Sequence, residues 1–189
     1  MVRTGDPTMR PFPLIDGVVD YAVRPSRSDW MDVFLCAEAR FFVGNTSGLY
    51  LLATAFGTPC ALANVIPSSH LAFAPADVSI LKLIWSDRLS RYLTFPEIFS
   101  GPVANYRFAK LFSQDGLRVD ENTEEDLREL VLEMLGRVEG SYRETSEERA
   151  LQKQFFSLLR PSHFGHGAAG RIGARFLERH RDFLGSGAV

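Results

Sequence analysis

Three consecutive residues, Thr46, Ser47 and Gly48, have the types and the position to bind a phosphate group. They follow an apolar stretch, 41–43, that is typical of a buried strand, and they precede an apolar stretch, 49–56, that is typical of a short helix. The amides in the first turn of a helix lack partners within the helix and carry partial positive charge. The sequence therefore predicts an anion site made of helix amides and two hydroxyl groups. Ordinary capping of the helix is the alternative, and it needs only one of these residues.

Four further polar residues are candidates for ligand contacts: Asp6, Asn64, Lys82 and Glu97. Asp6 follows a predicted strand end, and Asn64 closes a predicted buried strand, where it would bind a base, ribose or sugar or simply make a turn. Lys82 stands in an apolar run, from which its ammonium would reach a phosphate or extend to water. Glu97 would bind ribose hydroxyls or, more simply, complement the dipole of a first helical turn. Asn64, Lys82 and Glu97 therefore each have a ligand-binding and a structural interpretation, and Asp6 is a polar candidate by its position.

Other patterns that resemble sites are excluded. The segment 165–170 formally fits G-x-G-x-x-G, but no apolar strand precedes it, as dinucleotide binding requires. His163 and His166 have no Cys, Asp or Glu cluster near them in sequence, so no metal is expected. Cys36 and Cys60 are expected to be reduced packing residues. We therefore expect neither a metal nor another cofactor.

Predicted strands and helices alternate along the chain, which indicates an α/β fold with a Rossmann-like, doubly wound and mostly parallel sheet. Ligands of such sheets bind outside the carboxyl ends of the strands, where the polar candidates above would lie. We expect a sheet domain over 1–140, helices packing on it over 141–184 and a disordered tail over 185–189. Strands are predicted at 1–4, 17–22, 41–43, 60–63 and 117–120, and helices after Ser28 and at 49–56, 79–85, 94–99, 123–139, 145–160 and 168–184.

Composition is that of a globular protein in water, with 46% apolar and 23% charged residues. A formal net charge of -2 gives no general attraction to nucleic acid, which is not an expected partner. No apolar run approaches the ~20 residues of a transmembrane segment, and the first residues do not have the pattern of a signal peptide. The expected compartment is the cytoplasm.

Several motifs match one family. They are Ser28-Asp-Trp-Met-Asp-Val-Phe-Leu-Cys-Ala37, Phe41-Phe-Val-Gly-Asn-Thr-Ser-Gly48 and Phe56-Gly-Thr-Pro-Cys-Ala-Leu-Ala-Asn-Val-Ile-Pro67, with further matches at 91–97, 122–126 and 167–177. These segments, which extend over nearly the whole chain, resemble a family of bacterial glycosyltransferases. More distantly, the chain is similar to the C-terminal, donor-binding half of heptosyltransferases and other enzymes of the GT-B type.

The resemblance implies that the chain binds a nucleotide-diphospho-sugar donor, whose sugar is transferred to a hydroxyl of an acceptor glycan. It places the turn from Asn45 to Gly48 against the diphosphate, without a metal. The general base would belong to an acceptor-binding half, so no catalytic residue is assigned here. The first alternative is a non-catalytic remnant or interaction module with the same fold, and a second is epimerase chemistry on a sugar nucleotide.

One departure from the family concerns the start of the sheet. Members of the family are longer, and their donor half begins with a strand and a helix before the strand that we predict at Met1. In the strand order 3-2-1-4-5-6 this first strand is central, so its absence would leave two strands without their common neighbour. We therefore expect a fragment of a longer enzyme that requires a partner chain, a homo-oligomer or a rearranged sheet.

Overall fold

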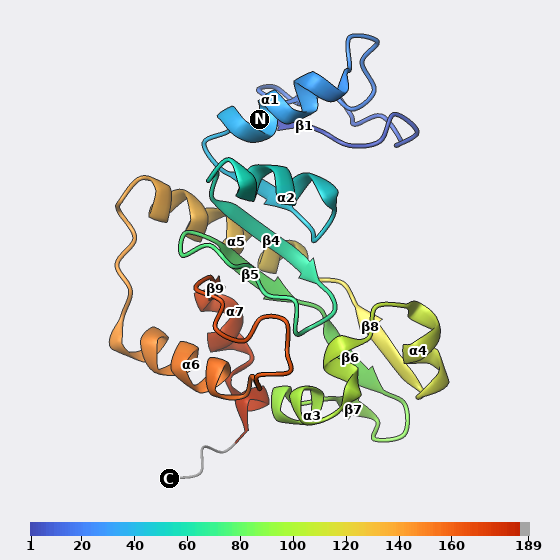
Figure 1. The fold of residues 1–189 in the computed structure, drawn as a ribbon, viewed down its shortest axis with the longest axis vertical. Coiled ribbons are helices and arrows are strands. Elements are labelled where there is room, and N and C mark those ends of the chain that lie inside the picture. The colour runs from blue at the N-terminus through green and yellow to red at the C-terminus, as the bar shows by residue number, and fades with distance from the viewer. Residues whose placement is uncertain (186–189) are drawn as a thin grey trace.

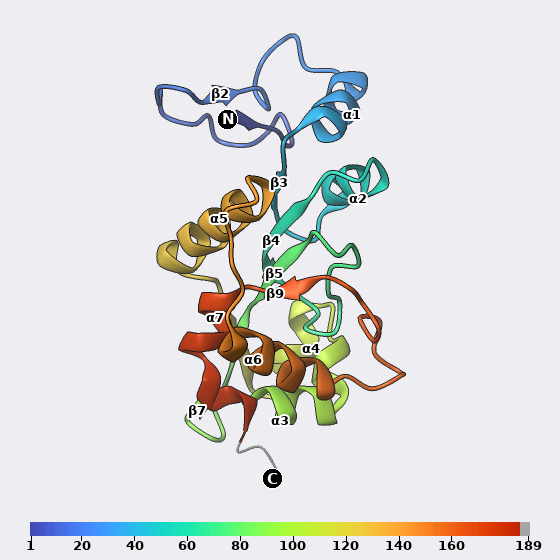
Figure 2. The same cartoon turned by 90° about the vertical axis from the view of Figure 1, so that its left-hand side faces the viewer.

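The protein has an α/β fold, in which a parallel four-stranded sheet has helices on both sides (Figures 1 and 2). The computed structural model describes residues 1–185, so the predicted tail lies outside the described residues except for Gly185. The four-stranded sheet has the order β3 (Phe42–Gly44), β4 (Cys60–Val65), β5 (Val78–Leu81) and β9 (Arg171–Ile172). The helices are α1 (Asp29–Glu38), α2 (Gly48–Ala55), α3 (Phe95–Ser100), α4 (Ala109–Gln114), α5 (Glu124–Val138), α6 (Ser146–Ser157) and α7 (Ala174–Arg179).

The predicted β-α-β unit is confirmed as β3, α2 and β4. β3 and β4 are parallel, with Phe42 opposite Cys60 and Gly44 opposite Leu62. The residues of β4 are almost all buried, as expected of a strand covered on both faces. Because β5 pairs with β4 in the same direction, the carboxyl ends of β3, β4 and β5 meet at one edge of the sheet.

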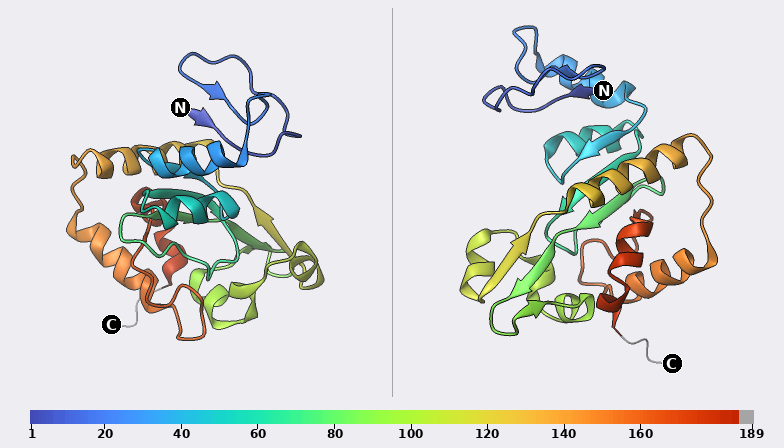
Figure 3. Two further views of the ribbon diagram at one scale, coloured as in Figure 1. Left: turned by 45° about the horizontal axis from the view of Figure 1, so that its top comes forward. Right: turned by 180° about the vertical axis from the view of Figure 1, so that it is seen from behind.

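The first 38 residues form a separate N-terminal unit that carries its own small sheet. Its strands β1 (Val2–Arg3) and β2 (Val19–Asp20) are parallel and pair only with each other. The helix predicted after Ser28 is confirmed as α1, and the Ser28 hydroxyl caps it by accepting a hydrogen bond from the Met31 amide. α1 then packs beside α2, which joins the N-terminal unit to the rest of the molecule. Figure 3 shows this unit at the end of the molecule opposite α3.

The structure corrects the prediction of helical turns at 79–85. This segment forms β5 and then β6 (Leu83–Ser86), with Lys82 between them. Both strands are largely buried, and a short run that is apolar throughout does not distinguish a strand from a buried helix by its periodicity. β6 lies between β7 (Arg91–Tyr92) and β8 (Leu117–Asp120), antiparallel to both. The strand predicted at 117–120 is therefore confirmed, but it belongs to this second sheet.

The prediction of a continuous helix at 168–184 is wrong. The segment contains β9, the short helix α7 and a 3-10 turn, η2 (Arg181–Leu184). An added Cβ at Gly173 would stand 2.8 Å from the Ile80 side chain, so β9 can lie against β5 only because glycine follows it. β9 thereby brings residues from the predicted helical region, 141–184, into the sheet.

The helices predicted at 94–99, 123–139 and 145–160 are confirmed as α3, α5 and α6, and each begins with a capping box. Thr94, Thr123 and Thr145 each form a capping box with the acidic residue three positions later. The buried face of α5 carries Leu130 and Met134, which join the main core. α6 contributes the fully buried Phe155 to the same core. In the described part of the chain, no helix combines the length and the apolar character needed to cross a bilayer.

Candidate functional site

The candidate site is the carboxyl edge of the parallel sheet. Gly44 ends β3, and the turn 45–48 leads from it into α2. The loop 66–70 follows β4, and Lys82 follows β5. Since these strands are adjacent and parallel, the two loops are neighbours, and the Thr46 hydroxyl donates a long hydrogen bond of 3.4 Å to the Ile66 carbonyl. The order of the strands therefore brings the predicted anion-binding turn, 45–48, next to the loop after β4.

The turn before α2 keeps its polar groups available. Ser47 is the N-cap residue of α2, but its hydroxyl accepts no hydrogen bond from the helix amides. Within residues 1–185, the amides of Gly48 and Leu49 also have no hydrogen-bond acceptor. Asn45, Ser47 and Gly48 are exposed, so these groups face solvent. An N-cap serine that does not cap its own helix leaves both its hydroxyl and the helix amides free for an anion.

A tyrosine and a histidine adjoin this turn. The buried Tyr50, in the first turn of α2, shares a hydrogen bond of 3.3 Å between its hydroxyl and Nε2 of His70. Burial lowers the pKa of His70, and the nearby cation of Arg107 lowers it further. Burial also raises the pKa of the Tyr50 hydroxyl. The pair is therefore uncharged at neutral pH, and Arg107 is the cation beside it.

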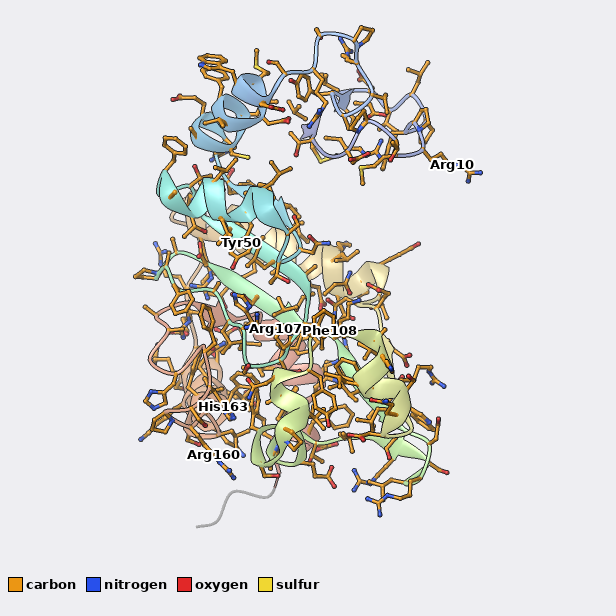
Figure 4. The ribbon with its side chains drawn as sticks, turned by 45° about the vertical axis from the view of Figure 1, so that its right-hand side comes forward. Arg10, Tyr50, Arg107, Phe108, Arg160 and His163 are labelled. Atoms are coloured by element: carbon orange, nitrogen blue, oxygen red, sulfur yellow. The ribbon has the colours of Figure 1, made fainter. Side chains whose placement is uncertain are left out.

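The position of Arg107 follows from contacts between the loop after β4 and the turn η1 (Pro102–Asn105). The Ser69 amide donates to the Ala104 carbonyl at 2.9 Å, and the Ser69 hydroxyl donates to Asn105 Oδ1 at 2.6 Å. Arg107 and the 70% exposed Phe108 follow η1 directly. Figure 4 shows Tyr50, Arg107 and Phe108 in the same part of the molecule. An exposed aromatic ring next to an arginine offers a surface on which a nucleotide base can stack.

Asn64 has a structural role in this structure. It adopts a positive φ of 55° in β4, and its amide donates to Asn122 Oδ1 at 2.6 Å. In return, the Asn122 amide donates to Asn64 Oδ1 at 2.7 Å. Asn122 Nδ2 also donates to the Leu81 carbonyl at 2.8 Å. This bridge between the two asparagines joins β4 and β5 to the start of α5, and it occupies the side-chain oxygen that was a candidate for binding a sugar or a base.

Lys82 and Glu97 are held by protein partners. The ammonium of Lys82 lies 2.6 Å from the carboxylate of Glu121, so it is already paired. Glu97 closes the capping box of α3 and also receives two hydrogen bonds from the Arg91 guanidinium, at 2.9 and 2.6 Å. These hydrogen bonds lower the pKa of Glu97 to about 2. Glu97 also lies in the first turn of α3, as in the dipole-matching alternative that the sequence favoured.

Asp6 does not join the site. It lies in the N-terminal unit, where Oδ1 accepts hydrogen bonds from both the amide and the hydroxyl of Thr8. These hydrogen bonds, which make a local turn, lower the pKa of Asp6. Of the predicted site residues, the structure therefore brings together Asn45, Thr46, Ser47 and Gly48, while it gives Asp6, Asn64, Lys82 and Glu97 other partners.

Two grooves lie away from this turn and differ from it in charge. One is an open depression lined by Glu129, Arg175, Glu178 and Arg179. The other has a volume of about 220 Å³ and includes four carboxylates, so it is unsuited to a diphosphate; it is lined by Leu83, Tyr92, Asp120, Glu121, Asn122, Thr123, Glu125, Asp126, Arg179 and His180. Among residues 1–185, no group of three or more metal-binding side chains converges on either place.

Sequence reasoning did not identify Tyr50, His70, Arg107 and Phe108. A signal for His70 was present, because it belongs to the loop after a buried strand, where ligands of α/β sheets bind. Arg107 and Phe108 gave no such signal, since only η1 brings them near. Together with the turn, these residues form a surface that offers amides, hydroxyls, a cation and an aromatic ring. No family model, curated protein or solved structure matches this chain, so these side chains and their geometry are the basis for assigning a function.

Proposed function

We propose that the carboxyl edge of the parallel sheet binds a nucleotide-diphospho-sugar, and that the chain is the donor-binding part of a glycosyltransferase of the GT-B type. The observation that supports this proposal most is the state of the turn before α2. The Ser47 hydroxyl and the free amides face solvent at the strand ends, where ligands of doubly wound sheets bind, and the half-buried Thr46 hydroxyl has only a long hydrogen bond to the Ile66 carbonyl. A diphosphate is the part of the donor that these groups would hold.

The chemistry assigned to the turn is stabilisation of the leaving group. As the sugar leaves, negative charge develops on the diphosphate, and fixed amides lower the energy of that charge without reorganising. The Thr46 and Ser47 hydroxyls add two donors, and the cation of Arg107 adds charge on the side of His70. The exposed Phe108 ring would stack on the nucleotide base. The chain would otherwise act by holding the donor in position for an acceptor hydroxyl.

Calorimetric titration with UDP-, GDP-, ADP- and CMP-sugars tests this assignment. We expect one of the four to bind, and we expect the double variant Thr46→Ala, Ser47→Ala to weaken that binding roughly 100-fold or more. Two hydrogen bonds to a charged group, at about 1.5 to 3 kcal/mol each, account for such a loss. Because Ser47 does not cap α2, the substitution should leave the thermal midpoint nearly unchanged.

The matched control replaces two exposed helix hydroxyls far from the turn. Ser113 and Ser157 donate only to carbonyls of their own helices, so Ser113→Ala with Ser157→Ala removes two hydroxyl groups without touching the site. This control should bind the donor as the wild type does. Unchanged affinity in the Thr46, Ser47 variant would refute the role of the turn.

A non-catalytic interaction module is the second candidate. It is favoured by the number of polar residues at the strand ends that are bound within the protein, since Asn64 and Lys82 both have partners there. Failure of all four nucleotide sugars to bind at millimolar concentration would support the module over the enzyme.

A further inference from the structure

His70 is connected to the anion-binding turn through a short turn of its own. Its amide donates to the Pro67 carbonyl at 2.9 Å, so the first and last Cα atoms of these four residues lie less than ~7 Å apart. Ile66, the residue before them, accepts the hydrogen bond from the Thr46 hydroxyl. Only four positions and one hydrogen bond therefore separate His70 from the anion-binding turn.

The glycine-rich segment 165–170 supports this loop. The Gly165 amide donates to the Ser69 carbonyl at 2.7 Å, and an added Cβ at Gly165 would stand 2.8 Å from the same oxygen. The ring of Phe164 contacts the His70 ring edge-on, with their centroids 4.4 Å apart. The segment that sequence analysis excluded as a dinucleotide motif thus has a structural role, because it holds the loop and the imidazole in place.

The hydrogen bond between Tyr50 and His70 decides which ring nitrogen carries the proton. Tyr50 is 6% exposed, and among residues 1–185 its hydroxyl has no acceptor other than Nε2 of His70. If Nε2 carried the proton, it would donate to the tyrosine oxygen, and the hydroxyl hydrogen of a buried side chain would lack an acceptor, which is costly. The hydroxyl therefore donates to Nε2, and the proton of the neutral imidazole is on Nδ1.

Nδ1 of His70 lies on the side of the ring away from the Tyr50 hydroxyl and is open to solvent. In the described part of the chain it has no hydrogen-bond partner, and it is not one of the enclosed polar atoms that lack one. The cation of Arg107 is close enough to the ring to lower its pKa. The imidazole N–H and the Arg107 guanidinium are thus hydrogen-bond donors additional to the amides before α2.

We propose that His70 donates its Nδ1–H to the second phosphate of a diphosphate whose first phosphate is held by the anion-binding turn, and that Tyr50 positions this donor. The assignment rests on the proposed diphosphate site and makes the loop after β4 the element that distinguishes a diphosphate from a single phosphate. A hydrogen bond to a charged phosphate oxygen is stronger than one between neutral groups, and Arg107 adds the charge that a second phosphate requires. His70 is thus a binding residue, and Tyr50 acts through it.

The ring nitrogens can be tested first, in the chain without ligand, by 15N NMR of the histidine side chains. His166 is exposed and has no side-chain hydrogen bond within residues 1–185, so it serves as the reference. We expect His70 to give the signature of the Nδ1–H tautomer and His166 that of the Nε2–H tautomer, which water favours. Tyr50→Phe should shift His70 toward Nε2–H. An Nε2–H signature for His70 in the wild type would overturn the proposal.

Calorimetric titrations with pyrophosphate and with inorganic phosphate test the binding role. His70→Ala should weaken pyrophosphate binding roughly tenfold or more, since one hydrogen bond to a charged group is lost, and should change phosphate binding much less. His70→Asn keeps an N–H donor near the position of Nδ1 and should restore most of the affinity. His70→Gln places its amide near the position of Nε2 and should behave as His70→Ala. The control His166→Ala should bind both anions as the wild type does.

An unchanged ratio of the two affinities in His70→Ala would overturn the proposal, as would equal affinities of the Asn and Gln variants. Failure of the wild type to bind pyrophosphate at millimolar concentration would overturn it too. A nucleotide sugar that binds His70→Ala as tightly as the wild type would refute the role of His70 and leave the proposed function standing. Pyrophosphate binding that depends on His70, without binding of any nucleotide sugar, would support this role and refute the proposed donor.

Discussion

Removal of the Asn122 side chain should destabilise the fold more than is usual for a half-buried polar residue. Asn122→Ala deletes the acceptor for the Asn64 amide and the donor for the Leu81 carbonyl, which lie 2.6 and 2.8 Å away. The bond from the Asn122 amide to Asn64 is unaffected, because it uses the backbone of Asn122. The variant therefore removes two hydrogen bonds and leaves two backbone groups at the strand ends without partners.

The expected loss of unfolding free energy is about 2 to 4 kcal/mol. A buried group that loses its partner costs about 1 to 3 kcal/mol, and Leu81 is fully buried, so its carbonyl cannot be satisfied by water. Asn64 is half-buried, so water compensates part of the loss at its amide. The nearby pair of Lys82 and Glu121 is the comparison. Glu121 is largely exposed, so Lys82→Ala should cost no more than about 1 kcal/mol.

Urea unfolding followed by circular dichroism measures both variants under the same conditions. The Asn122 variant should unfold at a lower urea concentration with an unchanged slope, as expected of a loss of stability alone. Asn64→Gly provides a further comparison, because glycine adopts the positive φ of 55° more easily and so offsets part of the lost bond. If Asn122→Ala and Lys82→Ala have equal effects, the two asparagines do not hold β4 and β5 to α5.

Two further predictions concern acid stability and the space beside β9. The pKa of Glu97 is depressed to about 2, chiefly by its hydrogen bonds with Arg91. Its contribution to the free energy of unfolding is therefore present above its unfolded pKa of ~4.3 and is lost as the pH falls toward 2. In urea titrations, Glu97→Gln should reduce the loss of stability over this range, and an unaltered pH profile would exclude the role of the pair. Gly170→Ala places a Cβ against the carbonyl oxygen of Ala72 and should cost about 1 to 3 kcal/mol of unfolding free energy. Gly136 lies within α5, and its added Cβ would stand 3.5 Å from the Tyr142 side chain, so Gly136→Ala should be neutral or stabilising by up to ~1 kcal/mol. Thermal unfolding compares the two variants, and equal midpoints would contradict the close approach of the backbone before β9 to Ala72.

Local signals in the sequence predicted the helices best. Ser28, Thr94, Thr123 and Thr145 all begin helices as expected, because a capping hydrogen bond involves residues only three positions apart. The β-α-β unit was also predictable, since Gly57 and Pro59 separate a helix from a buried strand within a short segment. Such interactions depend on neighbours in the chain and little on the remainder of the fold.

The turn 45–48 could be predicted as a site for the same reason, whereas its surroundings could not. The hydroxyl of Tyr50 on α2 meets His70 in the loop after β4, and Arg107 lies nearby because Ser69 contacts the turn η1. The assignment of Asn64 to a bridge also depends on Asn122, which is 58 positions away in the chain. These contacts follow from how the strands are ordered.

The amino-acid sequence by itself determined the class of fold, the capped helices and the exposed turn before α2. Only the tertiary structure decided that the run around Lys82 forms two strands and that β9 joins the sheet. The physical reason is that strand pairing joins backbone groups far apart in the chain, and a buried apolar run satisfies a helix and a strand equally well. Whether such a run forms a strand or a helix therefore depends on whether a neighbouring strand is available to pair with its backbone.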